Sequence, residues 1–394
     1  MNIFKKNKRS FIIVIILILL SGSVMAGFFS KELNKSEFLE LLTETKREGE
    51  DTLKNFDIKD IEFPVNELRD ITFKNTTWKN IDAHKRSLIN ITFKDCRLEN
   101  INFSYMEFGD LSFINCELRN VVTNNSKIGK LTVRDSHIYN TDTNGRNNWE
   151  YLEADTIEII NSKINDYESD DYLYTDISFF ESKADFIIKG SELKSFGGMG
   201  LKKGSSLEIY DSKIKDMDFS SSYLDHLIVK NSIIKKSKIN DSHIKTITLE
   251  NNKFYRFPVT NVKEGQIVYA RNNNDLTVSG KISEMQISDC TGKIGDISII
   301  EANFDLVNIR NCQIDEFIAF YMKGKKLVLE NVHVNKFDFG YSKVDELILK
   351  NITINKYINT EHAQVDNYKS DNVQVKTGIK RRTGGENITI KSTP

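Results

Sequence analysis

Apolar residues recur along much of this chain in pairs two residues apart, and each pair begins five residues after the previous one. Residues two apart on an extended chain point to the same side, and the polar residues between pairs suit a bend. An amphipathic helix would repeat at about 3.6 residues instead. The pattern therefore predicts short strands wound around an apolar core. It is clear at Ile91 and Phe93, Cys96 and Leu98, Ile101 and Phe103, and Met106 and Phe108.

The pairs group in fours, because equivalent residues return after 20 positions, as Leu207, Leu227 and Ile247 do. A chain with this period stacks each coil on the previous one. Its strands are then parallel, and its inward residues form ladders about 4.8 Å apart. We expect an all-β solenoid with about 20 residues per coil.

The repetition resembles the pentapeptide-repeat family over residues 71–138, 207–254 and 297–357. This resemblance implies a right-handed quadrilateral β-helix. The family favours a small first inward residue followed by Asp or Asn. Here that residue is often large, and the Asp or Asn precedes a small residue, as in Asp211-Ser212. A broader right-handed parallel β-helix with an Asn/Asp ladder at one corner is the alternative cross-section.

Residues 1–26 have the order of a secretory signal peptide: four basic residues, an apolar run over 11–20, and Val24 and Ala26 at the cleavage site. Cleavage would remove those four cations, so the net charge of -1 would become -5. An uncleaved N-terminal membrane anchor is the alternative. The chain is expected to be exported, to the periplasm, the cell surface or the medium.

Residues 27–70 are predicted to form a helical N-terminal cap, because an open solenoid end exposes strand edges and core. The amphipathic capping α-helix is expected over 30–56. The β-helix should follow over 71–357. Two irregular insertions and a C-terminal cap or tail are expected at 139–206, 255–296 and 358–394.

The composition excludes several function classes. The 55 Lys and Arg are balanced by 56 Asp and Glu, which argues against a nucleic-acid binder held by a basic field. A charged fraction of 28% and a mean hydropathy of -0.41 exclude a polytopic membrane protein. The chain has no phosphate-binding loop, dinucleotide fingerprint or metal-ligand motif, so neither a cofactor nor a metal is predicted.

The four cysteines form two pairs at nearly one coil of separation. Cys96 and Cys116 are 20 residues apart, and Cys290 and Cys312 are 22 apart. Each pair should stack on adjacent coils, either as small core residues or as a disulfide favoured by an oxidising compartment. Parallel side chains in a ladder disfavour the disulfide geometry, so both interpretations stay open at this point.

The insertion at 139–206 brings acids and aromatics together and contains the candidate binding residues. Aromatic rings and carboxylates can hold a sugar polymer, and two carboxylates at a defined gap can hydrolyse one. A run of acids in an insertion is also typical of a solvated loop. The residues singled out are Trp149, Tyr151, Tyr167, Asp170, Asp171, Tyr172 and Tyr174.

The function expected from these patterns is that of an exported, non-enzymatic β-solenoid whose extended surface binds a protein or a surface polysaccharide. Pentapeptide-repeat relatives include DNA-mimicking topoisomerase inhibitors and proteins delivered into host cells. The first role does not transfer to an exported chain without a strongly acidic surface, whereas the second implies host interaction. The alternative is a secreted carbohydrate-active β-helix enzyme, a lyase or a hydrolase, with its site in the insertion at 139–206.

Overall fold

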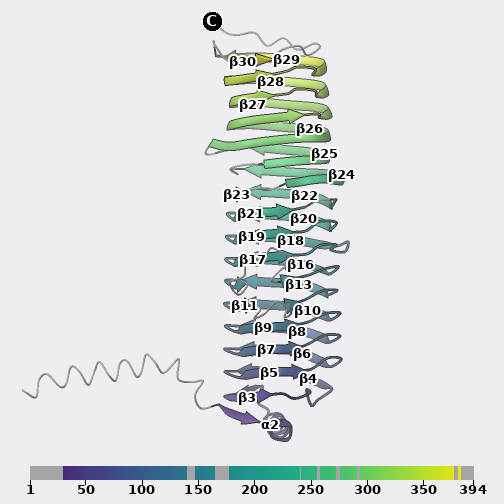
Figure 1. Cartoon of the computed structure of the whole chain (residues 1–394), viewed down its shortest axis with the longest axis vertical. Helices are drawn as coiled ribbons and strands as arrows, with labels where there is room; N and C mark the ends of the chain where they lie inside the picture. Colours follow the sequence, from purple (N-terminus) through teal and green to yellow (C-terminus); the bar gives the residue numbers. More distant parts are fainter. Residues whose placement is uncertain are drawn as a thin grey trace, which may run out of the picture.

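The computed structural model describes residues 30–139, 147–164, 177–239, 241–254, 258–271, 276–290, 293–376 and 380–382. These residues form a β-solenoid of about 14 turns with about 20 residues per coil, preceded by a single helix. The coils stack into a long column, with the helix at one end and the C-terminal coils at the other (Figure 1). Neighbouring strands in the described ranges pair in parallel, as a chain that winds in one direction requires.

Two walls of strands run along the column. The first sheet contains β1 (Lys31–Leu33), β3 (Phe56–Lys59), β5 (Thr77–Asp82), β7 (Arg97–Asn102), β9 (Glu117–Val122), β11 (His137–Tyr139), β12 (Asn147–Asn148), β14 (Lys163–Ile164), β15 (Ile177–Ser178), β17 (Glu192–Gly197), β19 (Lys213–Asp218), β21 (Ile233–Lys238) and β23 (Lys253–Phe254).

The second sheet continues to the C-terminal end. It contains β2 (Thr52–Lys54), β4 (Glu67–Lys74), β6 (Ser87–Lys94), β8 (Glu107–Ile114), β10 (Lys127–Arg134), β13 (Glu153–Ile160), β16 (Lys183–Lys189), β18 (Ser205–Tyr210), β20 (Tyr223–Lys230), β22 (His243–Glu250), β24 (Pro258–Arg271), β25 (Leu276–Ser288), β26 (Lys293–Phe320), β27 (Lys323–Asp338), β28 (Lys343–Asn359), β29 (Gln364–Val375) and β30 (Lys380–Arg382).

The N-terminal cap is the helix α2 (Lys35–Arg47), which is shorter than the expected span of 30–56. Asn34 and Glu37 form a capping box at its start. It ends before Gly49, whose φ of 72° suits glycine. The chain then enters the first coil at β2, so the solenoid begins inside the region expected to be cap. Phe38 packs the helix against the core through an edge-to-face contact with Trp78, with the ring centroids 6.0 Å apart.

The inward frame agrees with the apolar pairs. Ile91 pairs with Leu111, and Phe73, Phe93 and Phe113 stack one per coil at centroid distances of 5.2 and 5.4 Å. All five side chains are buried. Burying a large apolar side chain stabilises the fold by about 1.5–3 kcal/mol, so these ladders are the main source of stability.

The insertion at 139–206 leaves the stacking intact. Hydrogen bonds between coils connect the Glu150 N–H to Asn124, 26 residues away, and the Leu152 N–H to Ser182, 30 residues away. These coils are longer in sequence, yet their strands keep the parallel ladder with their neighbours. Part of the expected C-terminal tail also belongs to the solenoid, because β29 pairs in parallel with β28 from Gln364 to Val375.

The corners explain why Asp or Asn precedes a small residue. Asn231 has a φ of 52° and its amide donates to Asp211 Oδ1 at 3.1 Å on the coil before. Asn and Asp tolerate this left-handed conformation better than other side chains. The next residue, Ser232, turns inward, and its hydroxyl accepts from the Ser212 N–H at 3.1 Å. The same external amide ladder runs through Asp289, Asn311, Asn331, Asn351 and Asn372.

Candidate binding surface

The predicted site residues in the insertion at 139–206 do not form a described site. Trp149 does not present its ring to a partner, because its side chain is fully buried and its Nε1–H donates to the Val121 carbonyl at 3.0 Å. An indole fills core space and needs one hydrogen bond, and this position supplies both. Tyr151 is exposed at a corner. The remaining candidates lie outside the described residues: Tyr167, Asp170, Asp171, Tyr172 and Tyr174.

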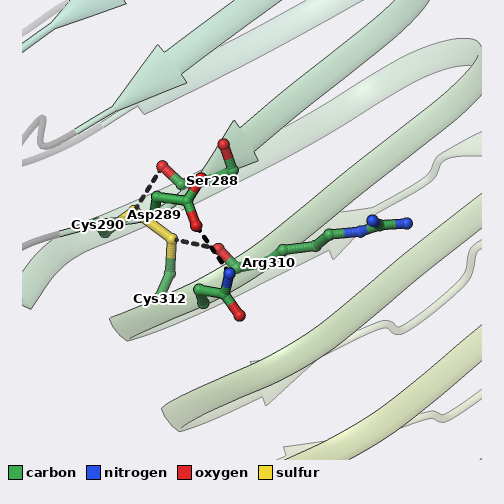
Figure 2. The surroundings of a disulfide bond; sticks show 6 residues. Ser288, Asp289, Cys290, Arg310 and Cys312 are labelled. Atoms are coloured by element: carbon green, nitrogen blue, oxygen red, sulfur yellow. Dashed lines mark hydrogen bonds between the residues drawn. A yellow bond between two sulfur atoms is a disulfide. The ribbon is translucent and has the colours of Figure 1, made fainter.

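The two cysteine pairs are in different chemical states. Cys290 and Cys312 form a disulfide with a Cα–Cα distance of 4.9 Å. Figure 2 shows this bond beside Asp289 and Arg310, joining β26 to the turn after β25. Cys96 and Cys116 are buried free thiols.

The free thiols take places in a buried hydroxyl ladder. Cys96 Sγ lies 3.2 Å from Thr76 Oγ1, and the Cys116 N–H donates to Ser136 Oγ at 3.0 Å. Cys116 Sγ lies 3.3 Å from the Phe93 carbonyl oxygen. The pKa of Cys116 is raised above its usual range, first by the hydrogen bond to Cys96 and then by burial. The pKa of Cys96 is lowered, first by the hydrogen bond to Cys116, and burial opposes this shift. The pair acts as small core residues.

Metal-binding and membrane-spanning features are missing from the described ranges. These ranges hold no group of three His, Cys, Asp or Glu side chains that could bind a metal ion. The one helix described there, α2, is neither long nor apolar enough to cross a membrane.

The strongest candidate surface is an aromatic corner on the C-terminal coils. Tyr321, Tyr341 and His362 occupy the same corner of three successive coils, with ring centroids 5.4 and 4.6 Å apart. The exposed fractions of the two tyrosines are 51% and 43%. Phe320 backs them from 4.4 and 5.4 Å. We call these four residues the aromatic corner.

The backbone of the aromatic corner is strained. Tyr321, Tyr341 and His362 have φ values of 54°, 55° and 55°. This left-handed conformation costs a bulky L residue on the order of 1 kcal/mol, and many other corners fill it with Asn or Asp. The absence of a side chain at Gly340 leaves space for the Phe320 ring and for Asn359, because an added Cβ would lie 3.3 Å from the ring and 2.7 Å from Asn359 Nδ2.

A column of polar side chains starts two residues after the aromatic corner. Asn303, Lys323, Lys343 and Gln364 are in register on four successive coils. Both lysines are exposed. The sequence therefore repeats Tyr-x-Lys at 321–323 and again 20 residues later. We call Lys323 and Lys343 the lysine pair.

A depression of about 600 Å³ lies beside the lysine pair. The buried Phe304 and Gly324 are among its lining residues, and a Cβ added at Gly324 would meet the Phe304 ring at 2.3 Å. A side chain at position 324 would therefore displace this ring. Asp305 and Asp345 also line the depression.

Several charges near the lysine pair are compensated within the solenoid. Lys325 contacts Asp305 at 2.7 Å, and Lys326 contacts Glu346 at 2.8 Å. Hydrogen bonds from Lys326 and then Lys369 hold the pKa of Glu346 below its usual range. The coils around the lysine pair therefore contain several ion pairs between neighbouring strands.

No protein-family model matches the chain, and neither a curated protein nor a solved structure was found to match it. Any function proposed for the chain therefore rests on its own geometry.

Sequence reasoning missed the aromatic corner. It followed the inward positions and the insertions, whereas this surface consists of outward residues within regular coils. The signal is present, because Tyr321 and Tyr341 recur at the coil period and each precedes a lysine by two positions. A search for the 20-residue period among outward aromatic residues would find them.

Proposed function

We propose that this chain is an exported, non-enzymatic β-solenoid that binds a partner macromolecule along the outer wall of its C-terminal coils. The observation that carries the proposal is the aromatic corner: exposed rings, stacked on successive coils, in a backbone conformation that tyrosine disfavours. Exposed aromatic clusters are typical of binding surfaces, because a ring buries much area with little loss of side-chain entropy.

The scaffold supports recognition better than catalysis. Internal ladders of buried apolar residues and corner amides make the wall rigid, so the rings are held ready for a partner. The depression near the rings contains Asp305 and Asp345, and Asp305 is already paired with Lys325. The described residues that line it therefore include no pair of free carboxylates.

Export is part of the proposal. The basic and apolar order of residues 1–26 supports it, and so does the Cys290–Cys312 disulfide, which suits an oxidising compartment. Membership of the pentapeptide-repeat family is proposed on the repeat alone, and host interaction would be consistent with that membership.

The test replaces the rings at Tyr321 and Tyr341 with asparagine in the full exported chain. Asparagine suits the left-handed backbone, so the fold should survive. The matched control is Tyr105→Asn, because Tyr105 also has a positive φ of 57° and is 58% exposed on a distant coil. Each protein is passed over immobilised polysaccharides and purified surface proteins, and release of reducing or unsaturated ends is followed.

Retention of the wild type and of Tyr105→Asn, with loss of retention in the double variant and no released ends, would support the proposal. Released ends would instead identify an enzyme. Equal retention of all three proteins would show that the aromatic corner is not the binding surface. Retention of none would leave the proposal without a partner class and overturn it for the polymers and proteins used.

A further inference from the structure

The lysine pair places two cations opposite each other on neighbouring coils of the outer wall, as the column Lys54, Lys74 and Lys94 also does near the N-terminal end. Lys323 and Lys343 are opposite each other in the parallel register, about 4.8 Å apart at the backbone. Like charges directly opposite on neighbouring strands are destabilising. Within the described residues, no carboxylate lies within ion-pair distance of either lysine.

The neighbouring coils show that an in-register pair of cations is not a necessity of the fold. One column away, Glu346 lies between Lys326 and Lys369 and pairs with both. Glu330 likewise pairs with Lys350 at 2.7 Å. A carboxylate at position 323 or 343 would neutralise the lysine pair in the same way, yet both positions hold a cation.

The cations are placed beside the rings. Each lysine follows a tyrosine of the aromatic corner by two residues, so ring and cation repeat together once per coil. The repeat along the column is about 4.8 Å, so an extended polymer lying along the axis with closely spaced anionic groups could meet both cations and both rings.

We propose that the aromatic corner and the lysine pair together bind an anionic polysaccharide, whose chain runs along the solenoid axis. Its carboxylate or sulfate groups would meet Lys323 and Lys343, and the apolar parts of its sugar rings would contact Tyr321 and Tyr341. Asn303, in register below Lys323, supplies a neutral amide for hydroxyl groups. The depression over Gly324 leaves room for a ring substituent.

This inference rests on the proposed function and narrows its partner class. Binding should be of moderate strength and sensitive to salt, because the ion pairs would form at an exposed surface. The strain at the tyrosines and the repulsion within the lysine pair would both be features of a surface that is complete only when the anion is bound.

The test measures binding of the full chain to polygalacturonate, to a sulfated glycosaminoglycan, to neutral dextran and to poly-glutamate of matched length. Each titration is run at about 50 and about 300 mM NaCl, over which the screening length shortens. The variant is Lys323→Gln/Lys343→Gln. Its control is Lys202→Gln/Lys203→Gln, which removes two exposed lysines from a distant turn.

The proposal expects at least one acidic polysaccharide to bind, more weakly at high salt, with the affinity reduced about tenfold in Lys323→Gln/Lys343→Gln and unchanged in the control. Equal loss in both double variants would reduce the effect to overall charge and overturn it. So would equal binding of dextran, or tighter binding of poly-glutamate. If a surface protein binds through Tyr321 and Tyr341 without the lysine pair, this inference fails while the proposed function stands.

Discussion

The external amide ladder allows a sharp test of what holds each corner. Asn331 has a φ of 55°, donates its amide to Asn311 Oδ1 at 2.9 Å, and accepts from Asn351 Nδ2 at 2.8 Å. It is exposed, so replacing it opens no cavity. Asn331→Ala removes both hydrogen bonds and puts a methyl group on a left-handed backbone. Asn331→Gly removes the same bonds but accepts the backbone without strain.

The expected magnitudes follow from the lost hydrogen bonds and the backbone strain. Two exposed amide hydrogen bonds are worth about 0.5 kcal/mol each, at the low end of the usual range. The left-handed conformation costs an alanine about 1–2 kcal/mol. Asn331→Ala should therefore destabilise the protein by about 2–3 kcal/mol. Asn331→Gly should cost about 1–2 kcal/mol, because the flexibility of glycine in the unfolded chain offsets part of the relief.

The assay must resolve single coils, because the stability of a solenoid is close to a sum of contributions from neighbouring coils. Amide hydrogen exchange of the strands β26, β27 and β28 would report the local opening free energy, with Asn372→Ala as the control. Asn372 has a φ of 52° and, among the described residues, one inter-coil amide bond, to Asn351, so its cost should be smaller. Equal costs for Asn331→Ala and Asn331→Gly would refute the attribution of the extra cost of alanine to backbone strain.

Three further predictions concern the core, the thiols and acid. Leu227→Asp should unfold the solenoid, because it buries an unpaired charge in a ladder, and an unchanged melting temperature would contradict the inward frame. Cys96 and Cys116 should not react with a bulky thiol reagent until the protein is denatured, because both are buried and reaction needs the thiolate; two reactive thiols in the native protein would be the opposite result. The pKa of Glu346 is depressed, first by Lys326, so its stabilisation is present above its unfolded value of about 4.5 and is lost as the pH falls through the lower folded value. Melting temperatures should therefore fall as acid is added, and Glu346→Gln should reduce that fall.

The sequence predicts the inward half of the structure well, because the core imposes a strict period. The spacing of Leu207, Leu227 and Ile247 alone predicts one ladder, and the register pairs them as expected. The order Asp211-Ser212 is visible in the sequence as a departure from the family pattern, but its cause is not. That cause lies between coils, in an amide bond and a hydroxyl cap that only the stacked structure shows.

The outward half is harder to predict, because solvent imposes no period on it. The irregular stretch around Trp149 is rich in acids and so suggests a surface ring, yet this side chain fills the core of a longer coil. The predicted helix is too long because its pattern of Leu and Glu continues to Leu53, which instead enters the first coil at β2. The cysteine pairs have nearly equal spacing, so their different states depend on local contacts: Cys96 and Cys116 lie in a hydroxyl ladder, whereas the buried Cys312 of β26 faces a partly buried Cys290 in the turn after β25.

The corner that holds Tyr321 and Tyr341 accepts several kinds of side chain along the solenoid. The equivalent turn is occupied by Lys85, Tyr105, Asn125, Tyr151 and Ser221 on other coils, all with positive φ. The ladders on either side therefore impose the backbone conformation, whichever of these side chains is present. A corner that tolerates such different residues has no structural need for rings on consecutive coils. Tyr321 and Tyr341 differ from Tyr105 and Tyr151 in that each precedes a lysine by two residues, whereas the other two precede a glutamate. A bound anionic polymer would engage both the rings and the cations of these two coils.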